Sequence, residues 1–597
     1  MMNRQPTPTP SAPAVGAPPW WQSAVVYQVY LRSFADSNGD GVGDLRGIIA
    51  RLDYLSELGV DVLWVSPFYP SPQADYGYDI SDYCSVDPLF GTLADVDALI
   101  EQLHSRGMKL VIDIVVNHTS DEHPWFTQSA SSTDNPKRDW YWWRPPRAGR
   151  LSGTAGAEPT NWMSFFSESA WQFDKASGEY FLHLFSRRQP DLNWENPQVR
   201  EAIYAMLRWW LDRGVDGFRL DVINAISKRL PLTDGPLMPG TPYGDGRASV
   251  LGGPRLHEFL HELNVEVIGG RDKTLMTVGE MPDVTVQEAA RFTDPANAEV
   301  DMVLQFEHME LDQGPGGKFD YRPLRLQDLK ASLGRWQVGL APVGWNSLYW
   351  DNHDQARAVS RFGSKDPVYR ELSAKLLATV LHLHRGTPFV YQGEELGMTN
   401  FPFSSVEEFT DIESLNFYRQ ATELGRDPDE VLASLSSRSR DNARTPMQWD
   451  AGPQAGFTSG TPWMPVNPNY RDINAAAQVA DPSSVFSHYR QLIALRHDLP
   501  AVAYGNFSML LQDDKQIYAF TRRLDDVELL TLANFSDTPV TRDLPEGEAW
   551  AGADLLLTNY PAQSEDPAPA VMLRPWEARI YRRVTHRQRP AADGSHP

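Results

Sequence analysis

The stretch DGFRLDV, residues 216–222, is a short apolar run that leads into an acidic residue, Asp221. Runs of this length between turn residues are typical of buried β-strands. The segment before it keeps the apolar spacing of a helix, begins with the capping pair Asn196 and Pro197, and ends at Gly214. A helix, a glycine and then a strand is the repeating unit of parallel α/β folds, so the sequence predicts that class.

The same unit occurs twice more toward the N-terminus. Residues 45–58 keep helical spacing before Gly59 and the run VDVLWVSP, and a similar segment precedes Gly107 and the run KLVIDIVVNH. Gly214 lies more than twice as far from Gly107 as Gly107 lies from Gly59, so the third unit carries an insertion. Residues 119–185, rich in Ser, Trp and Pro, are predicted to form this inserted domain over the carboxyl ends of the strands, where loops build active sites.

Three carboxylates, Asp221, Glu280 and Asp354, follow short apolar runs in this order along the chain. Buried strands that end in acids are how α/β barrels present catalytic groups. A single aspartate after a strand is more often a helix cap, but three acids in order, each beside Arg219, Gly279 or His353, are hard to explain as caps. The pattern therefore predicts a barrel with a carboxylate active site.

Two of these acids have the surroundings that retaining glycoside hydrolysis needs, namely a carboxylate nucleophile and a protonated acid. Arg219 precedes Asp221 by two positions, so both side chains point to the same face of a strand, and the guanidinium is expected to keep Asp221 ionised. Glu280 leaves an apolar stretch, where desolvation is expected to keep its carboxyl protonated. Asp354 and His118 are predicted to contact sugar hydroxyls, although a lone histidine after a strand is usually structural.

The segment DSNGDGVGD, residues 36–44, has the oxygen donors of a calcium loop at alternate positions. The predicted metal ligands are Asp36, Asn38, Asp40, the carbonyl of Val42, and Asp44. The twelfth position is Gly47 rather than Glu, which excludes an EF-hand and favours a looser structural site for Ca²⁺ or Mg²⁺. The alternative is a solvated acidic turn without an ion.

The composition of the chain argues against several other classes of protein. The chain has 597 residues, 41% of them hydrophobic, which is enough for a large core and more than one domain. The net charge of −24 argues against a nucleic-acid partner, and no stretch has the ~20 apolar residues of a membrane span. Cys84 is the only cysteine, so an internal disulfide is impossible, and it is expected to be buried. The first residues lack the apolar core of a secretory signal, which predicts a cytoplasmic protein.

After residue 500 the pattern changes to short alternating runs, IYAFTRR, VELLTLANF and ARIYRRV, separated by turn residues. Such runs predict an antiparallel β domain. The predicted organisation is a disordered leader (1–18), an α/β barrel (19–118 and 186–500) interrupted by the inserted domain (119–185), an antiparallel β domain (501–585) and a disordered tail (586–597).

Seven stretches together resemble glycoside hydrolase family 13, the α-amylase family, from about residue 20 to 582, and most closely its oligo-1,6-glucosidase/α-glucosidase subfamily. They are DIVVNH (113–118), QPDLNWEN (189–196), GFRLDVIN (217–224), VGEMP (278–282), DNHDQ (351–355), FVYQGEELGMTN (389–400) and RTPMQWD (444–450). The resemblance implies a (β/α)8 TIM barrel with an inserted domain B and a C-terminal antiparallel β-sandwich. Ala356 departs from the family pattern, in which proline is common.

The resemblance also implies roles for individual residues. Asp221 would be the nucleophile, Glu280 the general acid and base, and Asp354 the stabiliser of the transition state. The implied glucose-binding residues are Asp75, Tyr78, His118, Phe185, Gln189, Arg219, Val222, His353 and Arg444. Valine after the nucleophile favours α-1,6 bonds, so the expected substrates are small oligosaccharides of the isomaltose type, with maltose and sucrose types as alternatives.

Two other functions remain open from the sequence. Sucrose isomerases of the same family carry an RLDRD segment, where this chain has ELDQGPGGKFDYRP, residues 310–323, so hydrolysis or transfer to an external acceptor is favoured over isomerisation. A catalytically inactive barrel that serves as a binding subunit is disfavoured, because all three acids are present.

Overall fold

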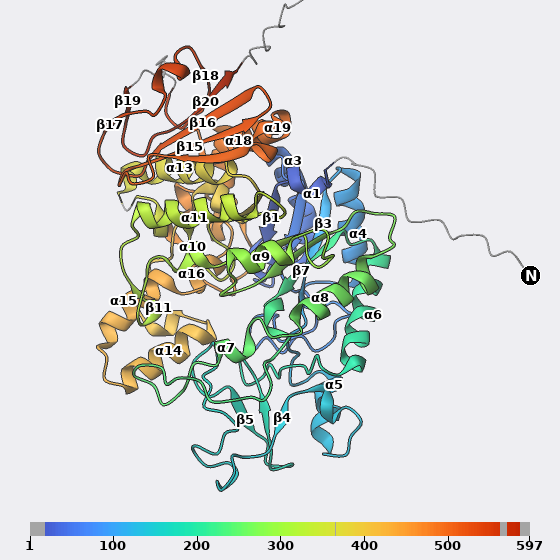
Figure 1. Ribbon diagram of the computed structural model, residues 1–597. Coiled ribbons are helices and arrows are strands. Elements are labelled where there is room, and N and C mark those ends of the chain that lie inside the picture. Colours follow the sequence, from blue (N-terminus) through green and yellow to red (C-terminus); the bar gives the residue numbers. More distant parts are fainter. Residues whose placement is uncertain (1–17, 365, 562–569, 586–597) are drawn as a thin grey trace, which may run out of the picture.

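The computed structural model describes residues 18–364, 366–561 and 570–585, so the predicted leader and tail fall outside the described residues, except for residue 18. Eight parallel strands form the centre of the molecule (Figure 1). They are β1 (Val26–Val29), β2 (Val62–Val65), β3 (Lys109–Val115), β7 (Gly217–Asp221), β8 (Met276–Glu280), β9 (Met302–Leu304), β12 (Ser347–Leu348) and β13 (Thr387–Tyr391).

These strands pair in the order β12-β13-β1-β2-β3-β7-β8-β9. A parallel bridge between Val303 of β9 and Asn346, just before β12, joins the two ends of the sheet. The sheet is therefore closed, and the fold is the predicted (β/α)8 barrel. The pairing register sets Val115 opposite Asp221 and Glu280 opposite Leu304, so the acids of β7 and β8 emerge at one end of the barrel.

Helices surround the barrel because each keeps one apolar face toward it. The principal ones are α2 (Leu45–Ala50), α3 (Leu52–Leu58), α4 (Leu93–Ser105), α6 (Pro197–Arg213), α8 (Leu256–Leu263), α9 (Val286–Phe292), α11 (Leu326–Leu340), α13 (Arg370–His382) and α18 (Val485–Asp498). Asn196 caps α6 and Gly214 ends it in the left-handed region, at φ 118°, as predicted. The helix predicted over residues 45–58 is instead divided at Arg51, whose ψ of 7° interrupts the helical path.

The inserted segment lies at the lower end of the molecule in Figure 1. It contains α5 (Pro124–Ser131) and an antiparallel sheet of β4 (Trp143–Arg144), β6 (Tyr180–Leu182) and β5 (Trp171–Phe173). A second lobe, which the sequence did not reveal, consists of α14 (Ile412–Glu423), α15 (Pro428–Arg438) and the hairpin β10 (Gln313–Gly314) and β11 (Gly317–Tyr321). Phe319, Phe403 and Val431 are among the residues of its separate apolar core.

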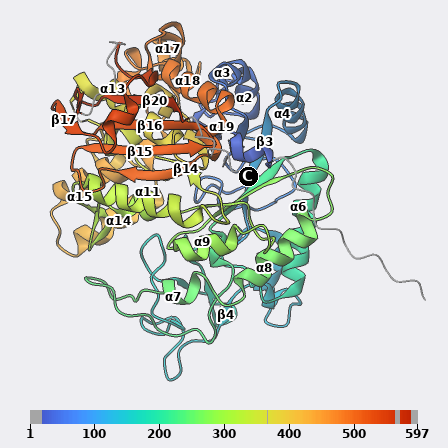
Figure 2. The same ribbon diagram turned by 45° about the horizontal axis from the view of Figure 1, so that its top comes forward.

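The C-terminal part is an antiparallel β domain stacked on the outside of the barrel helices (Figure 2). Its five-stranded sheet contains β14 (Asn506–Leu510), β15 (Ile517–Leu524), β16 (Val527–Asn534), β20 (Ala578–Val584) and β18 (Asp554–Thr558), and a second sheet pairs β17 (Val540–Asp543) with β19 (Ala570–Leu573). Residues from both sheets, such as Leu530, Val540 and Leu573, share one core. This is the layered arrangement that was predicted.

Two local expectations were wrong. The run at residues 347–355 was expected to be a strand ending at the acid, but β12 stops at Leu348 and Asp354 lies in the following loop. Cys84 was expected to be buried but is exposed, because it lies in a turn where its backbone N–H donates to Asp82.

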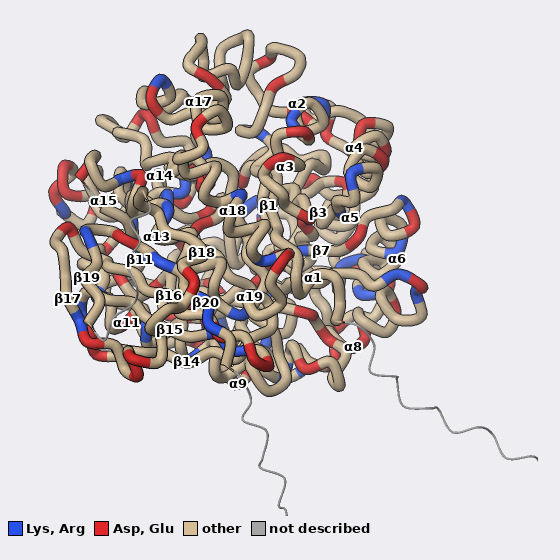
Figure 3. Tube along the Cα trace, turned by 90° about the horizontal axis from the view of Figure 1, so that it is seen from above, with Lys and Arg blue, Asp and Glu red and all other residues tan. Residues whose placement is uncertain are grey.

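Basic and acidic residues are interspersed along the Cα trace seen from above (Figure 3). Among the described residues, no helix is both long enough and apolar enough to cross a lipid bilayer.

Candidate active site

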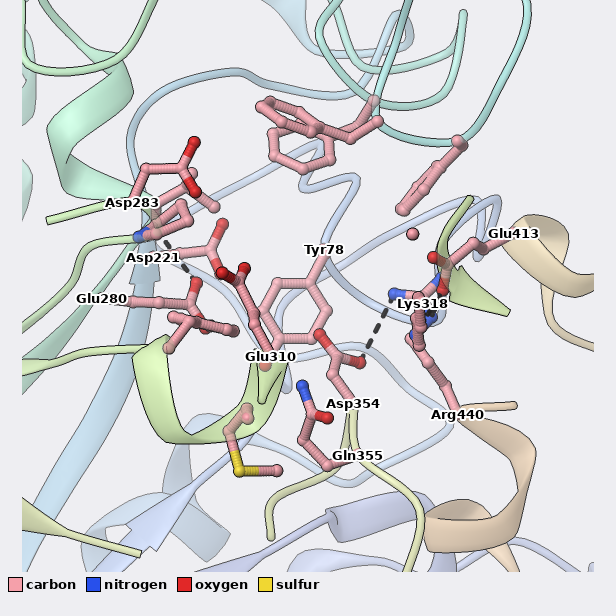
Figure 4. A pocket seen from close by; sticks show the side chains of 18 of the residues that line it. Tyr78, Asp221, Glu280, Asp283, Glu310, Lys318, Asp354, Gln355, Glu413 and Arg440 are labelled. Carbon is pink, nitrogen blue, oxygen red and sulfur yellow. Dashed lines mark hydrogen bonds and ion pairs between the residues drawn. The ribbon is translucent and has the colours of Figure 1, made fainter. Parts of the chain in front are cut away.

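A cavity of about 270 Å³ opens at the carboxyl ends of the barrel strands, between the inserted segment and the α14 lobe. The predicted site residues that line it are Asp75, Tyr78, His118, Phe185, Asp221, Val222, Glu280 and Asp354. Figure 4 shows Asp221 and Glu280 together on one side of Tyr78 and Asp354 on the other. The remaining predicted residues, Gln189, Arg219, His353 and Arg444, are buried behind this lining.

Asp221 and Glu280 are held by the same guanidinium. Arg219 Nη1 donates to Asp221 Oδ1 at 2.5 Å, and Nη2 forms an ion pair with Glu280 Oε1 at 2.5 Å. Arg219 itself is completely buried, and its Nη1 also donates to Asp113 Oδ1 at 2.7 Å. One fixed group therefore places the two carboxyl groups side by side at the floor of the cavity.

This cluster contains one cation and three buried acids, which sets its protonation. Burial raises the pKa of Glu280, with Asp354 and Asp113 adding repulsion and Arg219 opposing it. Burial also raises the pKa of Asp221 well above its usual value, although Arg219 lowers it. The predicted pairing of Arg219 with Asp221 is present, but it does not by itself keep Asp221 ionised, because the guanidinium is shared. Burial therefore favours the protonated form of the cluster more than one guanidinium can offset.

Asp354 has the opposite environment. Its Oδ1 accepts a hydrogen bond from Arg444 at 2.7 Å and a longer one from Arg440 at 3.4 Å, and His353 lies 3.5 Å from Oδ2. Burial alone would raise the pKa of the Asp354 carboxyl, but the neighbouring imidazole and the two guanidinium groups hold it well below its usual value. Asp354 therefore presents a fixed negative charge to the cavity.

The opposite wall carries a linked set of polar groups. Gln189 donates to Asp75 at 3.1 Å and lies 3.1 Å from His118, and burial lowers the pKa of His118 to about 3. Burial raises the pKa of Asp75 to about 6, although Arg440 and Arg444 lower it. A neutral imidazole and a carboxylate are thus available to sugar hydroxyls above pH 6. Tyr78 stacks on the ring of His353 with centroids 5.1 Å apart.

Val222 has a backbone conformation that is rare for its residue type. Its φ is 39°, in the left-handed region that β-branched residues avoid. In this conformation its backbone N–H donates to Glu280 Oε2 at 3.2 Å. The strained residue therefore helps to fix the carboxyl group of Glu280 next to Asp221, as is common for strain at functional sites.

Sequence reasoning missed several lining residues, most of all Arg440, which binds Asp75 at 3.2 Å and packs its guanidinium 4.7 Å from the ring of Phe166. A signal was present, because Arg440 precedes the predicted Arg444 by four positions, a spacing that puts both on one side of a helical turn. The other missed lining residues are Phe165, Phe166, Arg247, Pro282, Asp283, Phe306, Met309, Glu310, Gln313, Gly317, Lys318, Gln355 and Glu413.

The predicted metal loop lies away from the cavity. Asp36 accepts hydrogen bonds from the N–H groups of Asn38, Gly39 and Gly41, and Asp44 caps α2 by accepting from Gly47. Within the described part of the chain, no group of three or more His, Cys, Asp or Glu side chains is placed to hold a metal ion. The loop's amide and carbonyl oxygens suit a hard cation in type, and a bound ion there stays a prediction.

Paired carboxyl groups on the floor of a barrel cavity are the arrangement of a glycoside hydrolase. The family model "Alpha amylase, catalytic domain" matches residues 28–505, and the chain belongs to the α-amylase family of glycoside hydrolases. It is 56% identical to the oligo-1,6-glucosidase of Parageobacillus thermoglucosidasius, over 94% of this chain and 99% of that protein.

Two solved structures are also similar over almost the whole chain. Trehalose-6-phosphate hydrolase of Bacillus licheniformis is 45% identical with a TM-score of 0.87, over 94% of this chain and 99% of that one. The trehalulose synthase of Pseudomonas mesoacidophila MX-45 is 42% identical with a TM-score of 0.88, over 95% and 100%. Relatives with the same fold thus differ in substrate and product, so specificity has to be argued from the cavity.

Proposed function

We propose that the chain is a retaining, exo-acting α-glucosidase that removes terminal glucose from small oligosaccharides, preferentially at α-1,6 bonds and also at α-1,4 bonds. The observation that carries this proposal is the contact of one guanidinium, that of Arg219, with both Asp221 and Glu280. The preference for α-1,6 bonds is supported by Val222 at the cavity wall and by the oligo-1,6-glucosidase relatives.

The proposed reaction has two displacements. In the first, the Asp221 carboxylate attacks the anomeric carbon while Glu280 gives its proton to the leaving oxygen, so the glycosidic bond breaks and a β-glucosyl ester forms. In the second, Glu280 takes a proton from water, and the water oxygen attacks the same carbon and releases Asp221. Glucose leaves with the α configuration retained. Asp354 stabilises the positive charge that develops on the ring in both steps.

Exo action is supported by a charged pair in the cavity wall. Asp75 and Arg440 contact each other at 3.2 Å, with Asp75 buried and linked to Gln189. Charge-assisted hydrogen bonds from such a pair suit the outer hydroxyls of a terminal sugar. A glucose held there has its anomeric carbon toward Asp221 and Glu280.

Uncharged sugars are favoured over phosphorylated ones, although trehalose-6-phosphate hydrolases are among the relatives. The carboxyl groups that line the cavity belong to Asp75, Asp221, Glu280, Asp283, Glu310, Asp354 and Glu413, and the cationic side chains belong to Arg247, Lys318 and Arg440. Lys318 and Arg440 are already paired with acids, so a phosphate dianion would meet net repulsion.

Isomerisation of sucrose is the second candidate, because trehalulose and isomaltulose synthases share the fold. Glu310, Gln313 and Lys318, from the segment where isomerases carry RLDRD, line the cavity. An acidic and an amide side chain stand where isomerases have arginines, which favours hydrolysis. Incubation with sucrose decides: free glucose and fructose support hydrolysis, whereas isomaltulose or trehalulose without monosaccharides supports isomerisation.

A structural Ca²⁺ or Mg²⁺ ion in the loop at residues 36–44 belongs to the proposal. Asp36, Asn38, Asp40, the Val42 carbonyl and Asp44 would hold it. The ion would fasten this loop, which Asp36 already ties to Thr458 by a hydrogen bond at 2.5 Å. No step of the reaction depends on it.

The main test uses purified Asp221→Asn and Glu280→Gln on isomaltose and maltose, with the product anomer followed by NMR. Both variants are expected to lose turnover by a factor of about 10⁴ or more while keeping the circular dichroism spectrum of the parent. Parent-like rates in either variant, or release of β-glucose by the parent enzyme, would refute the proposal.

A further inference from the structure

Directly behind the Asp354 loop lie two buried acids that the reaction does not use. Asp351 begins the loop, and Glu394 opens the 3-10 turn Glu394–Leu396 that follows β13. They are 2% and 6% exposed.

In each acid one carboxyl oxygen accepts a hydrogen bond and the other has no hydrogen-bond donor. Asp351 Oδ2 accepts a hydrogen bond from the N–H of Ala358 at 2.9 Å, and Glu394 Oε1 accepts one from the hydroxyl of Tyr489 at 2.6 Å. Asp351 Oδ1 and Glu394 Oε2 are buried and have no donor as long as both groups are ionised. A buried acceptor without a partner is costly, so two in one place require an explanation.

The two acids line the same small cavity, of about 10 Å³, so their side chains face a common space. Apart from Tyr489, the remaining lining is apolar or glycine: Ala358, Val359, Ala374, Leu377, Gly397 and Met398. Arg357, the cation whose charge acts most strongly on Asp351, donates instead to the backbone carbonyls of Gln392, Asn442 and Ala443. In the described part of the chain no ion pair reaches either acid.

We propose that Asp351 and Glu394 share one proton, and that this acid pair is a positioning clamp for the loop that carries Asp354. A hydrogen between the two orphaned oxygens gives each of them a partner and leaves one negative charge instead of two. In agreement, burial and then the charge of Asp351 raise the pKa of Glu394 well above its usual value, and burial raises the pKa of Asp351.

The clamp holds the loop at both ends. Through its other oxygen Asp351 binds the first residue of α12 (Ala358–Phe362), so residues 351–358 form a closed loop with His353 and Asp354 inside it. Glu394 connects that loop to β13 and, through Tyr489, to α18. The expected effect on catalysis rests on the proposed role of Asp354. The inference that the two acids share a proton is independent of that role.

The shared proton determines how the stability of the fold changes with pH. The folded pair keeps it at pH values where an unfolded glutamate, with a pKa of about 4.3, has lost it. The stabilisation is therefore complete below that value and is lost as the pH rises through the raised pKa of the folded pair. The other charged or titratable groups around the pair are Tyr391, His382, Arg357, Arg361, Glu395 and Tyr489.

The neighbouring glutamate provides a matched control. Glu395 is buried one residue away, but its oxygens accept from Tyr27, Tyr54 and the N–H of Gly393 at 2.7–2.8 Å. A glutamine fits at Glu394, because its amide donates to Asp351 and accepts from Tyr489. The same change at Glu395 puts an amide N–H₂ against groups that already donate. Glu394→Gln is therefore expected to keep a parent-like kcat and to be at least as stable as the parent at pH 7, and Glu395→Gln is expected to lose stability.

Three measurements test the clamp. The infrared difference spectrum between parent and Glu394→Gln at pH 7 should show the loss of one protonated carboxyl band. Between pH 6 and 9 the ratio of folded to unfolded parent protein should fall relative to that of Glu394→Gln, by up to about tenfold per pH unit. Glu394→Ala, which leaves Asp351 alone, should lower kcat on the order of 10- to 100-fold with little change in KM, as expected for a displaced catalytic group.

The outcomes separate the two proposals. If Glu394→Gln is as damaging as Glu395→Gln, or if no protonated carboxyl band is lost, the shared proton is refuted. If the band is lost but Glu394→Ala keeps the parent kcat, the positioning role is refuted. If Asp221→Asn is active, the proposed function fails while the infrared and stability results still judge the acid pair.

Discussion

Lys228→Met should destabilise the fold in a way that depends steeply on pH. Lys228 is 1% exposed, and its Nζ donates to Asp191 Oδ2 at 2.7 Å, Asn117 Oδ1 at 3.0 Å and the carbonyl of Ala225 at 2.6 Å. Asp191 is completely buried where the chain returns from the inserted segment, and Asn117 precedes His118. The ammonium therefore joins the insertion to the loop after β7, the strand that ends at Asp221.

The magnitude follows from what Asp191 can do without its cation. Breaking a buried pair by removing one partner costs about 3–5 kcal/mol. The isolated carboxyl can instead bind a proton, which at pH 7, against an unfolded pKa of about 3.9, costs about 1.36 × 3.1, or about 4 kcal/mol. At pH 5 the same cost is only about 1.5 kcal/mol. The hydrogen bonds that Lys228 makes to Asn117 and to the carbonyl of Ala225 add about 1–2 kcal/mol at any pH.

The pH dependence of the variant's stability has the sign expected when the pKa of folded Asp191 is raised. In the variant, folded Asp191 carries a proton that the unfolded chain releases above its own pKa, so the stability of the variant relative to the parent falls as pH rises. Urea unfolding followed by tryptophan fluorescence at pH 5, 6 and 7 measures this difference, provided the slopes with urea agree. The double variant Lys228→Met/Asp191→Asn should lose only the pH-independent part. An equal penalty for Lys228→Met at pH 5 and pH 7 would refute the reasoning.

Three further predictions concern the cavity and the loop at residues 36–44. Arg440→Met should raise the pKa of Asp75 above about 6 by removing its nearest cation, so inhibition by glucose should weaken at pH 7 and recover at higher pH, measured as the inhibition constant against pH. Val222→Thr should shift the α-1,6 to α-1,4 ratio of kcat/KM toward α-1,4 by about 1–3 kcal/mol, and an unchanged ratio would contradict the role of this side chain. Removal of divalent ions by a chelator should lower the melting temperature of the parent but not of Asp36→Ala, and equal shifts in both would count against the metal site.

The parts of the site that were predicted correctly are those encoded within one element. Arg219 and Asp221 share a face because a strand alternates its side chains, and that contact needs no information from elsewhere in the chain. The same holds for the helix that ends at Gly214, where a cap, an apolar stripe and a glycine agree. Local rules therefore sufficed for the repeating helix and strand unit and for the contact of Arg219 with Asp221.

The residues that were missed depend on packing between distant segments. Arg440 contacts Asp75 across 365 positions of sequence. The adjoining α14 lobe has an apolar core whose residues showed no recognisable helix or strand periodicity in the sequence. Asp354 lies past the end of a two-residue strand, so its place depends on a loop held by Arg440, Arg444 and Asp351 rather than on strand geometry. No pattern within 351–355 specifies such long-range partners.

Protonation is the property least accessible from sequence, because it depends on how many acids share each cation. Around Arg219 three acids meet one guanidinium, which does not offset the rise in pKa that burial gives Asp221 and Glu280. Around the half-buried Asp354 lie two guanidinium groups and the ring of His353, and although both guanidinium groups also contact Asp411, together they hold the pKa of Asp354 well below its usual value. The two halves of the cavity thus reach opposite states at one pH with the same kind of side chain. That difference is what acid catalysis and charge stabilisation require of neighbouring carboxyl groups.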